Sequence, residues 1–195
     1  MSREFELKYR ADAATIDAIA QKFGDFTPIT METTYYDTPD LKFSARRWTL
    51  RRRLENGQAV CALKIPLPDG SRGEWEAACP SLMAGIMQLC AQGAPQELLA
   101  LTASGVKPLC GAKFTRLAKT IPLEEGLVEL ALDQGWLLGG NQELALYEVE
   151  VEKKSGSDQV AVAFAQQLQQ DFGLSPEPKS KQARAVELAA GKKEG

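Results

Sequence analysis

The stretch EFELKYR, residues 4–10, decides the fold because charged and apolar side chains alternate along it. In a β-strand successive side chains point to opposite faces, so Glu4, Glu6 and Lys8 share one face and the apolar residues between them share the other. The stretch therefore predicts a strand that aligns two carboxylates and an ammonium. A strand with one solvated face shows the same alternation, so the remaining strands have to decide what the charged face meets.

Four later segments repeat this alternation: LRRR (50–53), RGEWE (72–76), ELALD (129–133) and YEVEVE (147–152). Acidic side chains gather on some of these strands and basic side chains on others. Like charges at positions i and i+2 lie roughly 6–7 Å apart, so Glu148, Glu150 and Glu152 destabilise their strand unless a cation or facing bases neutralise them. This sorting suggests a site for both a cation and a polyanion, although the charges alone favour a solvated face over such a site. A solvated sheet face is the alternative that the residues leave open.

The order of the expected elements predicts an α+β fold built on one antiparallel sheet, because strands and helices do not alternate regularly. Closing an eight-stranded sheet into a β-barrel would gather the charged faces in a corridor and leave the apolar faces outside, under amphipathic helices. We expect one domain over residues 1–190 and a solvated end at 191–195. Helices are expected at about 12–23, twice within 80–104, after 157 to about 172, and at 179–190. Strands are expected at about 4–10, 32–37, 45–55, 58–66, 72–78, 112–123, 126–135, 135–140 and 144–154.

Composition limits the class of protein. The chain has 195 residues, of which 44% are hydrophobic and 25% charged, and this is typical of a globular domain. Its net charge of −3 argues against a general nucleic-acid partner, because affinity for phosphate backbones normally comes from a basic surface. No stretch approaches the ~20 apolar residues of a membrane span and the first residues are charged, so we expect a cytoplasmic protein without a membrane partner.

The residue types that are missing limit the class of site. The sequence contains no histidine, which removes histidine metal sites and the Ser-His and Cys-His nucleophiles. Its four cysteines have no C-x-x-C spacing, so they predict neither a zinc site nor a disulfide framework. Any metal must then be bound by oxygen, which suits Mg²⁺ or Mn²⁺. The phosphate-binding patterns G-x-x-x-x-G-K-[ST] and G-x-G-x-x-G are also absent.

Nearly the whole chain resembles the CYTH-domain family of the triphosphate tunnel metalloenzyme superfamily. A lone E-x-E-x-K motif is weak support, but the series of motifs in order along the chain is specific. These motifs are EFELK (4–8), YYDTPD (35–40), LRRR (50–53), LK (63–64), RGEWE (72–76), KFTR (113–116), ELALDQG (129–135), YEVEVE (147–152) and SKQAR (180–184). The resemblance implies an eight-stranded antiparallel tunnel. It is strongest to the bacterial inorganic triphosphatases, whose amino-terminal CYTH domain is often followed by a helical CHAD domain.

The resemblance also implies roles for individual residues, carried over by position. It implies that acids hold one or two divalent cations and that bases hold a linear triphosphate. The catalytic candidates are Glu4, Glu6 and Lys8. The metal candidates are Glu4, Glu6, Glu74, Glu76, Asp133, Glu148, Glu150 and Glu152. The substrate-binding candidates are Lys8, Arg51, Arg53, Lys64, Arg72, Arg116, Lys181 and Arg184.

The function implied by the resemblance is metal-dependent hydrolysis of inorganic tripolyphosphate to pyrophosphate and phosphate. The alternatives are a thiamine triphosphatase or other nucleoside triphosphatase, a class IV-type adenylate cyclase, and a non-catalytic polyphosphate-binding module. Side-chain alternation adds one sharper expectation: Arg51 and Arg53 point into the corridor, whereas Arg52 points outward with Trp48 and Leu50. The sequence leaves the physiological triphosphate and the oligomeric state open.

Overall fold

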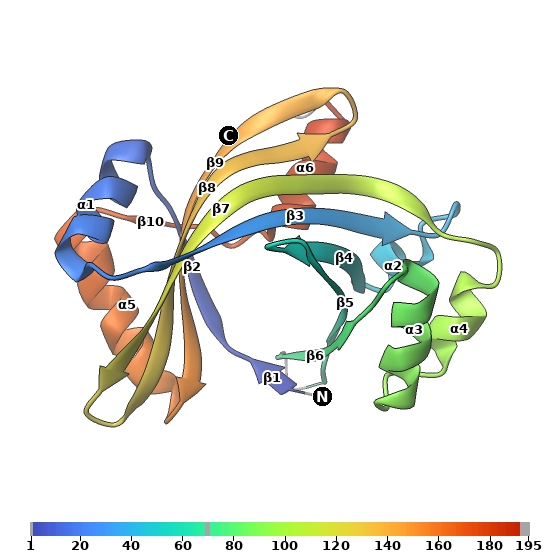
Figure 1. Ribbon diagram of the computed structural model, residues 1–195, viewed down its shortest axis with the longest axis horizontal. Coiled ribbons are helices and arrows are strands. Elements are labelled where there is room, and N and C mark those ends of the chain that lie inside the picture. The colour runs from blue at the N-terminus through green and yellow to red at the C-terminus, as the bar shows by residue number, and fades with distance from the viewer. Residues whose placement is uncertain (1, 69–70, 192–195) are drawn as a thin grey trace.

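One curved antiparallel sheet and the helices packed on it form the fold (Figure 1). The computed structural model describes residues 2–68 and 71–191, so the solvated end expected at 191–195 lies outside the described residues apart from Gly191. The strands follow the order β1-β6-β5-β4-β3-β7-β8-β9-β2-β10 across the sheet. This arrangement confirms the α+β class expected from the sequence.

The N-terminal segment links the two ends of this row of strands. β1 (Ser2–Glu4) pairs with β6 (Arg72–Ala78), whereas β2 (Glu6–Arg10), which begins only two residues after β1 ends, pairs with β9 (Gln142–Ser155). The stretch that contains Glu4 and Glu6 therefore completes a ring of strands, as the tunnel architecture requires (Figure 1). The break between β1 and β2 falls at Phe5.

The other strands of the ring run antiparallel to their neighbours. Asn56 and Gly57 connect β4 (Thr49–Glu55) to β5 (Gln58–Pro66). Their φ angles are positive, 49° and 82°, as a two-residue hairpin turn requires. The remaining strands of the ring are β3 (Thr27–Asp37), β7 (Lys107–Leu123) and β8 (Gly126–Gly139).

Several expected strands have other bounds in the structure. The strand expected from residue 45 begins at Thr49, because α2 (Lys42–Ala45) and a left-handed Arg47 (φ 59°) precede it. The two strands expected on either side of Gly135 are one strand, β8. A Cβ at Gly135 would clash with the backbone of Lys113 and Phe114, so glycine permits close strand approach here rather than a turn.

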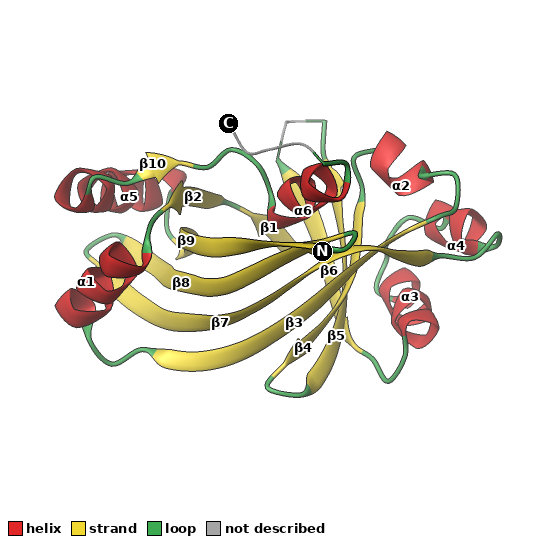
Figure 2. Ribbon diagram, turned by 90° about the horizontal axis from the view of Figure 1, so that it is seen from above, coloured by secondary structure: helices red, strands yellow, loops and turns green. Residues whose placement is uncertain are grey.

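Helices cover the outer, apolar faces of the sheet in two separate places (Figure 2). α1 (Ala13–Phe23) and α5 (Asp158–Phe172) pack on outward side chains of β2, β8 and β9, such as Val149. α3 (Leu82–Ala91) and α4 (Glu97–Thr102) pack on outward side chains of β4, β5 and β6, including Leu50 and Trp75, and on Trp48 just before β4. The expected placement of the apolar faces is confirmed. No helix in the described part of the chain is long and apolar enough to cross a membrane.

The last helix, α6 (Lys181–Ala189), packs on the inner face of the sheet. Its buried Ala185 joins a cluster with Ala112, Phe114 and Leu137 from β7 and β8. The helix approaches closely enough that a Cβ on Gly139 would clash with the Ala185 carbonyl oxygen. α6 therefore fills part of the interior of the ring and brings Lys181, its first residue, to the remaining space.

Candidate functional site

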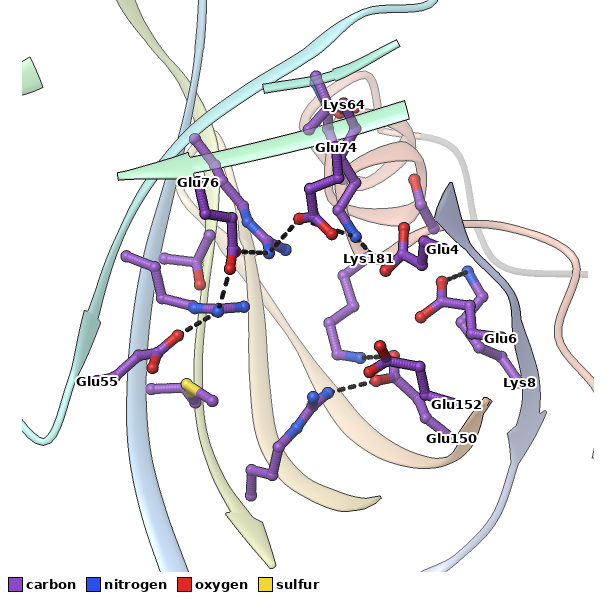
Figure 3. A pocket seen from close by; sticks show the side chains of 18 of the residues that line it. Glu4, Glu6, Lys8, Glu55, Lys64, Glu74, Glu76, Glu150, Glu152 and Lys181 are labelled. Carbon is purple, nitrogen blue, oxygen red and sulfur yellow. Dashed lines mark hydrogen bonds and ion pairs between the residues drawn. The ribbon is translucent and has the colours of Figure 1, made fainter. Parts of the chain in front are cut away.

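The charged inner faces of the strands enclose a cavity of about 310 Å³ (Figure 3). Acidic and basic side chains line it in equal numbers, so the cavity is nearly neutral overall. The acidic residues are Glu4, Glu6, Glu55, Glu74, Glu76, Glu129, Glu150 and Glu152. The basic residues are Lys8, Arg51, Arg53, Lys64, Arg72, Arg116, Lys154 and Lys181.

The structure brings most of the residues singled out in the sequence to this cavity. Arg51 and Arg53 line it and Arg52 does not, as the alternation along β4 predicts. Three candidates, Asp133, Glu148 and Arg184, are buried instead behind the cavity wall. They lie on the expected faces, but α6 covers that part of the inner surface.

Several lining residues were missed. Thr49, Glu55 and Lys154 continue the inward faces that already carry Arg51, Arg53 and Glu152, so side-chain alternation could have found them. Thr33 and Tyr35 on β3 also line the cavity, but they are uncharged, so the pattern of charged faces could not identify them. Ser180 and Gln182 reach the cavity only because α6 lies inside the ring.

One wall of the cavity, on β4, β5 and β6, carries arginines with unused donors. The Nε atoms of Arg51, Arg53 and Arg72 are buried without a hydrogen-bond acceptor among the described residues. Burial and the neighbouring Arg51 lower the pKa of Arg53, so the two guanidinium groups repel each other. Buried donors without acceptors are costly, and an anion in the cavity would supply the missing acceptors.

Carboxylates on this wall hold the same bases in place. The Nη2 atom of Arg51 lies 3.3 Å from Oε1 of Glu74 and 3.3 Å from Oε1 of Glu76. Lys64 Nζ lies 2.5 Å from Glu4 Oε1 and 3.5 Å from Glu74 Oε1 (Figure 3). These pairs orient the bases toward the cavity without satisfying all of their donors.

The opposite wall contains a concentration of carboxylates around Glu6. Glu6 lies directly across from Glu152 in the β2–β9 register, and like charges in that position are destabilising. Burial raises the pKa of Glu6, and the nearby carboxylates of Glu150 and Glu4 raise it further. Lys8 Nζ is 3.7 Å from Glu6 Oε1, and it also donates to the Lys179 carbonyl oxygen at 3.2 Å. A further cation beside Glu6 would therefore be favourable.

A second group of carboxylates, Asp133, Glu148 and Glu150, lies deeper. Their oxygens lie within 4.8 Å of one another, a spacing that could hold a metal ion. In the structure Lys181 Nζ contacts all three, at 2.7 Å from Asp133 Oδ2 and 2.7 Å from Glu150 Oε1. Arg116 adds a bidentate pair with Asp133, at 2.8 and 2.7 Å. Arg184 Nη1 lies 3.1 Å from Glu148 Oε2, so three protein cations already neutralise this group.

Burial and these cations set the pKa values of the deep group. Burial raises the pKa of Glu148 to about 7, despite the opposing effect of Lys181. Burial also acts to raise the pKa of Glu150, but Arg116 and Lys181 hold it well below its usual value. For Lys181, burial acts to lower the pKa, but the three carboxylates raise it well above its usual value. The ammonium of Lys181 therefore stays charged inside the protein.

A family model described as the CYTH domain matches residues 2–186. The chain belongs to the CYTH domain family. An inorganic triphosphatase of Haemophilus influenzae is 25% identical to it over 190 residues, which is 93% of this chain and 54% of the relative. This CYTH chain therefore spans about half the length of that curated relative.

Solved structures share the CYTH fold at lower identity. HpAC1 from Hippeastrum, for which a dominant triphosphatase activity is described, superposes with a TM-score of 0.66 at 18% identity and covers 97% of this chain and 96% of its own. The PH1819 protein of Pyrococcus horikoshii OT3 has a TM-score of 0.63 at 21% identity, with 95% and 99% covered. Similarity at this level shows the fold alone, so the activity has to be inferred from the residues of the site.

Proposed function

We propose that this chain hydrolyses inorganic tripolyphosphate to pyrophosphate and phosphate in the charged cavity, with a divalent cation, Mg²⁺ or Mn²⁺. The observation that carries the proposal is that one cavity has buried donors without acceptors on one wall and crowded carboxylates on the other. Arg51, Arg53 and Arg72 have buried donors that need an anion, and Glu6 lies among carboxylates that need a cation. A linear polyphosphate with a bound metal ion meets both needs. The CYTH family and the inorganic triphosphatase of Haemophilus influenzae add support.

The residues around Glu6 fit a hard divalent cation. Glu4 and Glu6 line the cavity from the N-terminal segment, and Glu150 and Glu152 line it from the neighbouring β9. Carboxylate oxygens are the ligands that Mg²⁺ and Mn²⁺ prefer. When bound, such an ion supplies Lewis-acid polarisation of phosphoryl oxygens and neutralises charge on them. We therefore assign the metal to this set.

The remaining metal candidates fit less well because Asp133 and Glu148 do not line the cavity, and Glu74 and Glu76 lie on the wall that carries the arginines. Lys181 would have to leave Asp133 and Glu148 before a metal could bind there. Arg51 contacts both Glu74 and Glu76. We propose that these four carboxylates hold the bases in position for the substrate.

The bases of both walls would bind the phosphate oxygens. Arg51, Arg53 and Arg72 offer guanidinium donors from one wall, joined by Lys64. Lys8, Arg116 and Lys181 offer cations from the other wall and from α6. Arg184, which the sequence also suggested, is buried against Glu148 with Nη1 3.1 Å from Oε2, so it supports the site from behind.

These groups suit in-line transfer of a phosphoryl group to water. The cationic side chains would neutralise charge that develops on the leaving pyrophosphate, where charge-assisted bonds in a water-poor site are strong. A cavity carboxylate would orient the attacking water and accept its proton. No covalent intermediate with the protein is needed. The reaction therefore needs no histidine, cysteine or serine nucleophile.

Phosphate release from a panel of substrates tests the proposal. Tripolyphosphate, ATP, thiamine triphosphate and pyrophosphate would each be incubated with the protein in Mg²⁺, in Mn²⁺ and in excess EDTA. We expect the highest kcat/KM with tripolyphosphate and none of this activity in EDTA. Preference for thiamine triphosphate or ATP, formation of cyclic AMP from ATP, or tight binding without turnover would each contradict it in favour of a different activity.

A further inference from the structure

Glu177 is a buried carboxylate that belongs to neither wall of the cavity. It lies in the link between α5 and α6, after β10 (Ser175–Pro176), and its residue is 2% exposed. It does not line the cavity. Burying a carboxylate away from its substrate or metal is costly, so its contacts should explain it.

The backbone around Glu177 fixes the link to β2. β10 pairs with β2, with Ser175 opposite Arg10, and the Glu177 amide donates to the Lys8 carbonyl oxygen at 2.8 Å. Prolines on both sides of Glu177 restrict the backbone, because proline fixes its own φ and disfavours helix in the residue before it. The chain is thus held extended beside β2 just before it turns into α6.

The side chain of Glu177 ties this link to α6. Its Oε2 accepts from Arg10 Nε at 2.5 Å and lies 3.6 Å from Arg184 Nε, and its Oε1 accepts from the Lys179 amide at 2.9 Å. Arg10 belongs to β2 and Arg184 to α6. The Glu177 carboxylate therefore bridges the strand that carries Lys8 and the helix that carries Lys181.

Arg184 carries the connection onward to the cavity. It lies one helical turn after Lys181, so the two side chains share a face of α6. Arg184 Nη1 lies 3.1 Å from Glu148 Oε2, and Glu148 Oε1 contacts Lys181 Nζ. Charges alternate along this path: carboxylate, guanidinium, carboxylate, ammonium. When Glu177 loses its charge, Arg184 interacts more strongly with Glu148. This stronger interaction weakens the contact between Glu148 and Lys181.

We infer that Glu177 is a positioning residue: through Arg184 and Glu148 it sets where the Lys181 ammonium sits in the cavity. The role of Lys181 as a substrate contact rests on the proposed function, but the placement of its ammonium does not. Glu177 therefore influences the site without touching the reacting atoms.

Lysine acylation measured by mass spectrometry tests this placement without relying on activity. The folded protein would be treated briefly with acetic anhydride, and acetylation of Lys181 compared with that of Lys113, which lies on the outer face. In Glu177→Gln, we expect Lys181 to be acetylated at least about twofold faster, at the low end of the coupling found between residues of one salt-bridge network. Lys113 should react at the wild-type rate. The matched control is Glu187→Gln on α6, which removes the more exposed 2.8 Å pair with Lys179, a residue just before that helix, and should leave the acetylation of Lys181 unchanged.

Kinetics then separate positioning from general loss of structure. If the chain hydrolyses tripolyphosphate, Glu177→Gln should lower kcat/KM in the wild-type background and have no further effect in Lys181→Gln. Equal losses in both backgrounds, or unchanged Lys181 acetylation in Glu177→Gln, would overturn the inference. Should Glu177→Gln not fold, Glu177→Asp carries the same test, because it keeps the charge but withdraws it from Arg184. An inactive wild type with faster Lys181 acetylation in the variant would contradict the proposed function and support this inference.

Discussion

Glu6 on β2 and Glu152 on β9 lie directly opposite each other across two neighbouring strands, and both line the cavity. The nearest cation to Glu152 is Lys154, whose Nζ lies 2.8 Å from Oε2. Among the described residues, Glu6 pairs with the more distant Lys8, at 3.7 Å, and Lys64 also acts to lower its pKa. The register of β2 on β9 thus creates an acidic site that the metal-free protein does not fully neutralise.

Replacing Glu6 with glutamine should remove catalysis and leave the metal-free fold intact. We expect Glu6→Gln to lower tripolyphosphate turnover by about 100-fold or more, on the scale of losing a group that stabilises the transition state. Its melting temperature in EDTA at pH 7 should equal or exceed that of the wild type, because burial and neighbouring carboxylates make a charged Glu6 unfavourable. Glu32→Gln, in an exposed pair with Lys113, is the control for the loss of a carboxylate. Wild-type turnover in Glu6→Gln would refute the metal assignment.

The three consecutive arginines of β4 test which face meets the substrate. Arg51→Ala and Arg53→Ala should each cost roughly 2–4 kcal/mol in kcat/KM, the scale of a charge-assisted contact in a water-poor site. Arg52→Ala should leave kcat/KM nearly unchanged, because Arg52 does not line the cavity. Steady-state kinetics on all three variants check this. A large loss at Arg52 with small losses at its neighbours would mean that the substrate lies elsewhere.

The metal-free protein should lose stability as the pH rises from about 4.5 to 7. Glu148 has its pKa raised from 4.5 to about 7 in the folded protein, so the folded state binds more protons than the unfolded state in this window. The contribution of Glu148 to stability is then greatest below the window and decreases through it, and the raised pKa of Glu6 acts in the same direction. Because the sequence contains no histidine, the change in stability in this pH range comes mainly from the titration of carboxylates. In EDTA, the melting temperature should change less with pH in Glu148→Gln than in the wild type. An equal change in both proteins would contradict a buried Glu148 with a raised pKa.

Side-chain alternation predicted which residues share a face, whereas the closed ring was implied by the resemblance to the CYTH-domain family. Arg51, Arg53, Glu150 and Glu152 could be placed because a strand in a barrel has only two faces, and hydrophobicity marks the outer one. Glu55 and Lys154 carry the same signal at the ends of those strands. The sequence therefore contained more of the cavity than its motifs alone indicated.

The position of α6 could not be predicted in the same way. Ala185 and its neighbours form an amphipathic helix, and that pattern does not reveal whether the apolar stripe meets the outer or the inner face of a sheet. Placing α6 inside buries Asp133, Glu148 and Arg184 and converts them from cavity residues to supporting ones. Long-range packing decides this outcome, so no local signal could have separated Glu148 from Glu150.

Tripolyphosphate with Mg²⁺ should raise the melting temperature, because a ligand that binds only the folded cavity shifts unfolding by mass action. At about 100 times its dissociation constant, a ligand adds roughly 2.7 kcal/mol to the free energy of unfolding. Orthophosphate should have a smaller effect, since its single phosphate offers fewer oxygens to the bases of the two walls. Differential scanning fluorimetry compares the two ligands at saturating Mg²⁺. Equal shifts would argue against a site built for a chain of phosphates.

The most direct measurement is a ³¹P NMR time course of tripolyphosphate with the wild-type protein and saturating Mg²⁺. The proposed reaction predicts that the tripolyphosphate signals decay while pyrophosphate and orthophosphate appear in equal amounts, and that excess EDTA stops the decay. The same course in Glu6→Gln should be nearly flat. Tripolyphosphate that persists unchanged with the folded wild-type protein and either Mg²⁺ or Mn²⁺ would contradict the central claim that this cavity is a metal-dependent triphosphatase site.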